Sequence, residues 1–178
     1  MSVKAPRFAV LAVLVIGLAA LSAPGCAKSE DRSAQWEADN PVVPLPESPL
    51  GAEADFAALK FEVTPEKVRL GRWLFYDGRL STDGTVSCGT CHRPENGFSE
   101  PTPHSTGVDG KTGTRKAPTF VNGAWPLYDV YFWDGRASSL QEQAKGPIIN
   151  PVEMANDHDT MITTLKGVSG YGKYFAEV

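Results

Sequence analysis

The sequence Cys88-Gly-Thr-Cys91-His92 constrains the fold more than any other feature of the chain. Two cysteines three positions apart share one turn of a helix, so both sulfur atoms can bond one edge of a porphyrin. A histidine directly after them can point its imidazole at the iron, and C-x-x-C-H is the attachment signature of c-type haem. The motif therefore predicts one covalent haem c, held by Cys88 and Cys91, with His92 as the axial iron ligand.

Two other kinds of site could use part of this motif. A redox-active C-x-x-C pair would favour a βαβ context, which the sequence lacks, and a zinc site would need a second pair of ligands. Only His104 and His158 remain to provide that pair. No obvious sixth iron ligand is present either, because Met161 occupies an apolar helical position and His104 lies in a polar loop.

The first 50 residues are predicted to lie outside the folded domain. Residues 1–25 combine a basic start with an apolar run of about fourteen residues, which suits an export signal and is too short for a transmembrane helix. Small residues before Cys26 indicate lipoprotein cleavage with this cysteine acylated; ordinary signal cleavage and a retained anchor are the alternatives. Residues 26–50, rich in proline, are predicted to be a tether. We therefore expect a periplasmic protein, lipid-anchored to a bacterial membrane, with one domain over residues 51–178.

Helical patterns, without any alternating run typical of a strand, predict a small, loop-rich, all-α domain. Thr64 and Pro65 are typical of a helix start and predict a helix over residues 65–76. A short helix is expected around residues 88–93. The stretch 93–125, rich in Gly, Pro, Thr and Asn, predicts a long loop of the kind that often lines a functional site.

Two further helices are predicted nearer the C-terminus. Ser138 can cap the first, and the Gly146-Pro147 pair is expected to break it. Asp157 or Asp159 can cap the second, whose apolar residues follow at helical spacing.

A series of motifs in a fixed order gives the domain a family resemblance. The series is Leu70-Gly-x-x-Leu74-Phe75-x-Asp77-x-Arg79-Leu80-Ser81, the haem motif, Arg115-x-Ala117-Pro118-Thr119, Phe132-Trp133-Asp134-Gly135-Arg136-Ala137, Glu142-Gln143-Ala144-x-Gly146-Pro147 and Pro151-x-Glu153-Met154. Together these resemble the N-terminal half of the bacterial di-haem cytochrome c peroxidases, a superfamily that includes the methylamine-utilisation maturation enzyme. The resemblance runs from about residue 62 to the last residue. It implies a class I cytochrome c-like domain that carries the peroxidatic haem.

The resemblance also implies roles for four side chains. Glu153 matches the distal acid–base residue, since a carboxylate over the iron can take a proton from hydrogen peroxide and return it to the departing oxygen. Gln143 and Phe132 match distal-pocket residues beside it, and Trp133 matches the indole that relays electrons between two haems. The implied function is a peroxidase that reduces hydrogen peroxide to water with electrons from a cytochrome c or a cupredoxin.

Two positions depart from the family pattern. Many members place a histidine within Ser-x-Gly-His, where it ligates the resting iron, but this chain has Val108 there and His104 is out of register. We therefore predict an open, high-spin ferric haem that needs no prior reduction. Where this chain has Lys116, the family has an asparagine that helps to hold a calcium ion. An ammonium group cannot coordinate a cation, which counts against calcium binding.

The sequence contains a single C-x-x-C-H and ends at Val178, whereas a complete family member has a second, C-terminal haem domain. Another chain could supply that domain, the sequence could be a fragment, or the domain could act alone. Three functions therefore stay open: a peroxidase, a monohaem electron-transfer or haem-sensing protein, and an inactive fragment of a di-haem peroxidase. Nucleic acid is not an expected partner, because the formal net charge is −4 and phosphates attract a surplus of cations.

Overall fold

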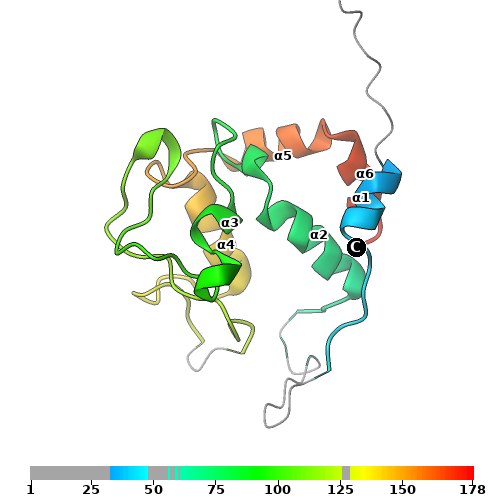
Figure 1. Cartoon of the computed structure of the whole chain (residues 1–178), viewed down its shortest axis with the longest axis horizontal. Coiled ribbons are helices and arrows are strands. Elements are labelled where there is room, and N and C mark those ends of the chain that lie inside the picture. The colour runs from blue at the N-terminus through cyan, green and yellow to red at the C-terminus, as the bar shows by residue number, and fades with distance from the viewer. Residues whose placement is uncertain (1–32, 48–55, 57–58, 60, 126–128) are drawn as a thin grey trace, which may run out of the picture. The chain divides into compact units, whose positions relative to one another are not determined.

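A computed structural model describes residues 33–47, 56, 59, 61–125 and 129–178, and within these the chain is helical without a β-strand (Figure 1). Its helices are α1 (Ser33–Asp39), α2 (Pro65–Phe75), α3 (Cys88–Cys91), α4 (Leu140–Ile149), α5 (His158–Lys166) and α6 (Ser169–Ala176), with single turns η2 (Gly78–Leu80), η3 (Pro94–Asn96) and η4 (Val108–Gly110). The all-α prediction is confirmed. None of these helices is long and apolar enough to cross a bilayer. The predicted signal peptide and Cys26 lie outside the described residues.

The core lies where α2, α5 and α6 pack together with η2 and the loops around them. Thr64 caps α2 as predicted: its Oγ1 accepts a hydrogen bond from the backbone N–H of Lys67 at 3.2 Å, and Pro65 follows as the first helical residue. The buried apolar side chains form one cluster, made of Leu70, Leu80, Val86, Val108, Met154, Leu165, Tyr171 and Tyr174. Two of them, Val108 and Met154, come from the long loop and from the segment after α4. The core therefore fixes both segments that approach the haem motif from the loops.

The start and the end of α4 differ from the prediction. Ser139, not Ser138, is the N-cap, and its Oγ accepts a backbone N–H of the first turn at 3.1 Å. The helix also runs through Pro147 to Ile149 instead of breaking. A proline inside a helix forfeits one hydrogen bond. Here the carbonyl of Pro147 accepts from the backbone N–H of Met154 at 3.2 Å, so the following turn holds the last residues of the helix.

The other helix predictions hold with small changes. Of the two candidate caps for α5, Asp157 is used, and its Oδ1 accepts from the backbone N–H of Thr160 at 2.8 Å. Asp159 lies in the first turn, where a negative charge suits the helix dipole. Helix α3 is shorter than predicted and ends at Cys91.

Part of the segment predicted to be a tether is folded. Within residues 26–50, helix α1 places the Trp36 ring 5.0 Å from the ring of Trp73 in α2 and 6.2 Å from that of Tyr171 in α6, between centroids. The prolines that suggested a tether begin only after this helix has ended. One large aromatic side chain is enough to dock a short helix on a core. This corrects the expected domain boundary at residue 51.

Polar contacts fix the chain just after α1. The buried side chain of Asn40 donates from Nδ2 to the backbone carbonyl of Arg69 at 2.9 Å and accepts from Arg72 Nε at 2.7 Å. Arg72 also donates from Nη2 to the carbonyl of Pro41 at 2.7 Å. These bonds satisfy polar groups that the docking of α1 buries.

Replacing Trp36 by alanine should lower the free energy of unfolding by about 2–4 kcal/mol, because it deletes most of the contact between α1 and the core. As a control, Gln35→Ala removes only an exposed hydrogen bond to Asp39 and should change it by less than about 0.5 kcal/mol. Urea unfolding of the haem-loaded protein, followed by circular dichroism, measures both. Equal effects of the two substitutions would contradict the docking of α1.

Candidate haem site

Helix α3 holds both cysteines of the motif on a single turn. Both thiols are free and half-buried. Burial raises the pKa of both thiols, and for Cys91 the charges of Glu100 and Glu153 add to it, giving a pKa of about 11. Dithiol redox pairs depend on a lowered thiol pKa. The surroundings of Cys88 and Cys91 therefore do not favour the redox alternative.

His92 directly follows α3, and a backbone contact sets the orientation of its ring. Nδ1 lies 3.0 Å from the carbonyl oxygen of Phe98. Because a carbonyl only accepts, Nδ1 carries the proton and Nε2 keeps its lone pair for a metal. Ligating histidines in metal sites are commonly oriented in this way. His92 therefore fits the predicted role of axial ligand.

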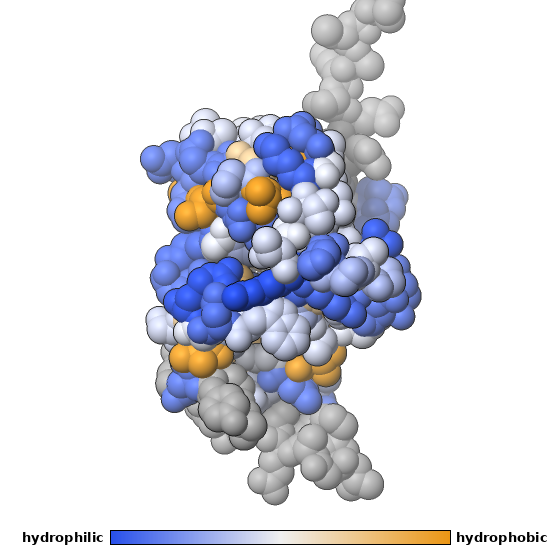
Figure 2. All heavy atoms as spheres, turned by 90° about the vertical axis from the view of Figure 1, so that its left-hand side faces the viewer, coloured by the Kyte–Doolittle hydropathy of each residue, from blue (hydrophilic) through white to orange (hydrophobic). Residues whose placement is uncertain are grey.

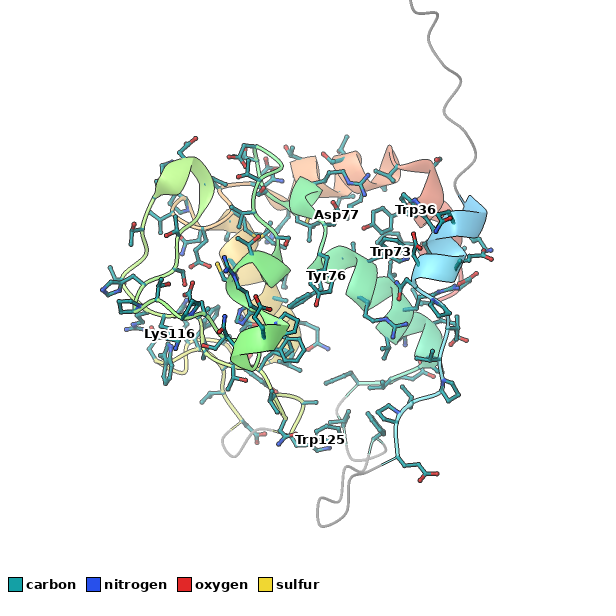
Figure 3. All side chains as sticks on the ribbon, in the orientation of Figure 1. Trp36, Trp73, Tyr76, Asp77, Lys116 and Trp125 are labelled. Carbon is teal, nitrogen blue, oxygen red and sulfur yellow. The ribbon has the colours of Figure 1, made fainter. Side chains whose placement is uncertain are left out.

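Aromatic rings lie around α3. Tyr76, which Figure 3 shows pointing from the end of α2 toward α3, packs against Gly89, where a Cβ would lie 2.5 Å from the Tyr76 ring. Phe120 lies 5.3 Å from His92 and 4.7 Å from Phe98, between ring centroids. Tyr76 and Phe120 nevertheless expose 56% and 40% of their surface. Large rings exposed beside the motif suit the flat apolar faces of a porphyrin, so the residues present fit a c-type haem.

The zinc alternative has less support. A structural zinc site needs four Cys or His ligands. The described residues contain no group of three or more His, Cys, Asp or Glu side chains that could hold an ion. His158 lies on α5, where its Nε2 is 3.3 Å from the carbonyl of Lys145.

Glu153 is held in the same pocket as the motif. Asn150 donates from Nδ2 to its Oε1 at 2.6 Å, and the backbone N–H of Val108 donates to its carbonyl at 2.9 Å. Burial raises the pKa of the Glu153 carboxyl, while the Asn150 bond and the charges of Arg136 and His92 act in the opposite direction. A half-buried carboxyl that senses the charge of the axial histidine is well suited to exchange protons in this pocket.

The two other predicted distal residues come together on α4. Phe132 has a left-handed backbone, with φ of 66°, and its ring packs against Gly146, where a Cβ would lie 3.0 Å from the ring. The guanidinium of Arg136 lies 3.5 Å from the centre of the Phe132 ring on the other side. Gln143 stands one turn before Gly146 and is half-buried. The structure thus explains why a glycine lies in α4: it gives the Phe132 ring room beside Gln143.

Trp133 lies at the surface and is held there. Its side chain exposes 66% of its area, while Nε1 donates to the backbone carbonyl of Lys116 at 2.9 Å. Next to it, Arg115 and Arg136 both pair with Asp134, at 2.8 and 2.7 Å, and their hydrogen bonds lower the pKa of Asp134 to about 2. Figure 2 views the molecule from the side on which Figure 3 labels Lys116, and shows hydrophilic residues interrupted by small apolar patches. A fixed, exposed indole among cations suits contact with another protein surface.

The two positions that depart from the family pattern lie in different surroundings. Val108 is 1% exposed and belongs to the core, whereas His104 lies exposed in the long loop. Valine has no atom that can bind iron, and its backbone N–H is already engaged by Glu153.

We therefore expect the oxidised haem-loaded protein to be high-spin at rest. The optical spectrum and low-temperature electron paramagnetic resonance (EPR) of the ferric protein measure this directly. Val108→Ala should leave the spin state unchanged, because neither side chain can bind the iron. A low-spin spectrum typical of two histidine ligands would contradict the prediction.

Two residues that organise the pocket were not predicted from the sequence. Glu100 is 6% exposed, and its Oε1 accepts from the backbone N–H of Ala117 at 2.8 Å and from the Ser105 hydroxyl. Gly107 lies so close to the chain after α4 that a Cβ would stand 2.4 Å from the carbonyl oxygen of Glu153. A lone acid and a loop glycine carry no local signal of such contacts.

Fold and site together define a helical domain built around a c-type haem attachment turn. Residues 65–178 match the family described as di-haem cytochrome c peroxidase. The match covers more than half of the chain, and the chain belongs to this family, which confirms the resemblance seen in its motifs. Membership implies a c-type haem cofactor and an oxidoreductase function of the peroxidase family.

Several known proteins are similar to this chain. Methylamine utilization protein MauG of Methylorubrum extorquens is 44% identical over 113 residues, which are 64% of this chain and 31% of that protein. Cytochrome c551 peroxidase of Nitrosomonas europaea is 40% identical over 119 residues, 65% of this chain and 35% of that protein. A solved MauG-like protein associated with microbial copper homeostasis has a TM-score of 0.60 at 28% identity, over 77% of this chain and 38% of the other. The chain spans about a third of the length of the curated relatives.

Proposed function

We propose that this chain is the domain of a cytochrome c peroxidase that reduces hydrogen peroxide to water, on a class I cytochrome c-like scaffold. The observation that carries the proposal is the half-buried carboxyl of Glu153, held by Asn150 and by the backbone of Val108. Its charge acts on Cys91, and that of His92 acts on it. An acid–base group beside a haem turn serves the cleavage of peroxide, whereas a simple electron carrier has no use for one. The relatives named as peroxidases support the proposal.

Each residue has a distinct task in this function. Cys88 and Cys91 would hold the haem by thioether bonds and His92 would bind its iron; when bound, the haem supplies electrons to peroxide. As a carboxylate, Glu153 takes a proton from hydrogen peroxide, and as the acid it returns that proton to the oxygen that leaves as water. Gln143 can hydrogen-bond peroxide, and the Phe132 ring keeps bulk water from the pocket.

The electrons are proposed to come from outside the described domain. Reduction of one peroxide to two waters consumes two electrons and two protons, and a reduced cytochrome c or cupredoxin is the proposed donor. A second haem domain, carried by a separate chain or by a further part of the same protein, would pass the electrons through Trp133, which is exposed for such a contact. Calcium is not part of the proposal, because Lys116 offers no ligand for it.

The proposed location is the periplasm. The export signal in residues 1–25 and the lipidation of Cys26 would anchor the domain to a bacterial membrane. Helix α1 lies only a few residues after that cysteine in the chain, so an anchored domain would act close to the membrane surface.

Mixing the haem-loaded protein with hydrogen peroxide tests the proposal. We expect a rapid change in the haem spectrum and steady oxidation of added reduced cytochrome c. A spectral change without turnover would identify a fragment that needs its second haem domain. No reaction with peroxide would overturn the proposal and favour a monohaem electron carrier or haem sensor.

A further inference from the structure

Trp73, Trp36 and Tyr171 form a continuous row of aromatic rings, here called the aromatic row. The centroids of Trp73 and Trp36 are 5.0 Å apart, and those of Trp36 and Tyr171 are 6.2 Å apart. Figure 3 shows the two indoles side by side between α1 and α2. Gly170 makes room for them, since a Cβ there would lie 2.4 Å from the Trp36 ring. Trp36 lies outside the residues that match the family, so the match does not account for the row.

Tyr171, at one end of the row, is bonded to a carboxylate. The ring is 1% exposed, and its hydroxyl donates to Oδ2 of Asp77 at 2.6 Å. Arg79 donates to the same carboxylate from Nε and Nη2, each at 2.8 Å. Burial raises the pKa of Asp77, but the hydrogen bonds from Arg79 and Tyr171 outweigh it and keep the pKa below its usual value. A phenol paired with an ionised carboxylate can release its proton whenever it loses an electron.

Trp73, at the other end, has no such partner. Its Nε1 is buried, and within the described residues no acceptor lies in hydrogen-bond reach. Indole nitrogen is a donor only, so an oxidised Trp73 has nowhere to send its proton and stays a cation. A cation in this apolar setting readily takes an electron from a neighbouring ring. Trp73 and Tyr171 therefore differ in kind: the first can pass an electron, and the second can remain oxidised.

The aromatic row lies next to the haem motif. Tyr76 stands one turn after Trp73 on α2, and its ring packs against Gly89 between the two cysteines. Asp77, the proton acceptor of Tyr171, is the next residue in the chain (Figure 3). The same turn of α2 thus contacts the haem attachment helix and carries the start of the row.

We propose that Trp73, Trp36 and Tyr171 form an electron relay that ends in a redox-active tyrosine, with Asp77 as its proton acceptor. The electron leaves Tyr171 through Trp36 and Trp73 and reduces the peroxide-oxidised haem site by one equivalent. The phenolic proton moves to Oδ2 of Asp77, so a carboxylate becomes a carboxylic acid and Tyr171 a neutral radical. A one-electron donor later restores the phenol, and Asp77 returns the proton.

This relay rests on the proposed function, because hydrogen peroxide is the oxidant that makes the haem site electron-deficient. Peroxide withdraws two electrons, and the sequence holds one C-x-x-C-H. A tyrosine that lends one of them would keep an oxidising equivalent inside the buried core and away from exposed side chains.

Rapid freeze-quenching after peroxide addition, with EPR detection, tests the relay in the haem-loaded protein. We expect a tyrosyl signal that narrows when the protein carries ring-deuterated tyrosine. Tyr171→Phe should abolish it. Tyr174→Phe is the matched control, since Tyr174 lies on the same helix, is 3% exposed and packs under the Arg69 guanidinium instead of bonding Asp77; it should keep the signal. Trp36→Phe leaves Tyr171 and Asp77 in place and should also abolish the signal.

A second measurement separates the relay from the peroxidase proposal. A flash-generated ruthenium polypyridyl oxidant, without peroxide, can oxidise the tryptophans of the haem-loaded protein directly. We expect transient tyrosyl absorption that Tyr171→Phe and Trp36→Phe reduce and Tyr174→Phe does not. Equal absorption in all four proteins would overturn the relay. A Tyr171 signal after the flash but none after peroxide would leave the tyrosine site standing and overturn its link to the proposed function.

Discussion

Glu153→Gln should slow the reaction of the haem-loaded protein with hydrogen peroxide by about 10²–10⁴-fold, because an amide cannot take the proton from peroxide. The Oε1 atom of glutamine can still accept from Asn150 Nδ2, so the pocket should keep its shape. The resting haem spectrum should therefore be unchanged. Stopped-flow absorbance after mixing with peroxide measures the rate. As a matched control, Glu142→Gln removes an exposed carboxyl of α4 that pairs with Lys145 and should have no effect.

The pH dependence gives an independent check on the same residue. The active form of Glu153 is the carboxylate, and burial raises the pKa of this group above its ordinary value of 4.5. The rate should therefore rise with pH through a midpoint above 4.5 and stay flat in the glutamine variant. A wild-type rate that is independent of pH across that range would remove Glu153 from the proton transfer, even if its replacement slows the reaction.

Local chemistry made the haem turn predictable from the sequence. Cys88, Cys91 and His92 are close because their spacing alone places them on one turn and its end. The helix starts at Thr64 and Asp157 were predictable for the same reason, since a cap bonds a backbone N–H three residues away. Wherever the partners are neighbours in the chain, the pattern of residue types contains the answer.

Contacts between distant segments were not predictable in this way. The carbonyl that orients His92 belongs to Phe98, whose φ of 58° no sequence pattern announces. Trp36 looked like part of a tether because its partners, Trp73 and Tyr171, lie 37 and 135 positions away. The distal position of Glu153 came from a family resemblance, not from its neighbours. Its burial depends on the long loop, which has no periodicity of its own to predict a path.

Gly107→Ala should impair both stability and the peroxide reaction, although the residue carries no reactive group. An added Cβ would lie 2.3 Å from the carbonyl oxygen of Val152 and 2.4 Å from that of Glu153, and both are backbone atoms that cannot turn aside. Relief of this overlap moves the loop and the segment after α4 apart and breaks the bond from Val108 N–H to Glu153. We expect a loss of about 1–3 kcal/mol in the free energy of unfolding. A distal carboxyl displaced by about 1 Å should slow the peroxide reaction by about 10²-fold.

The loop offers a matched control for this prediction. At Gly113 an added Cβ would meet its nearest neighbour, the carbonyl oxygen of Ser105, at 3.7 Å, which is ordinary contact. Gly113→Ala should therefore leave both the unfolding free energy and the peroxide rate close to wild type. Urea unfolding and stopped-flow mixing of the haem-loaded variants measure the two quantities side by side. If Gly107→Ala lowered stability as expected but left the peroxide rate unchanged, the position of Glu153 would not depend on its contact with the loop, and the loop would have only a structural role.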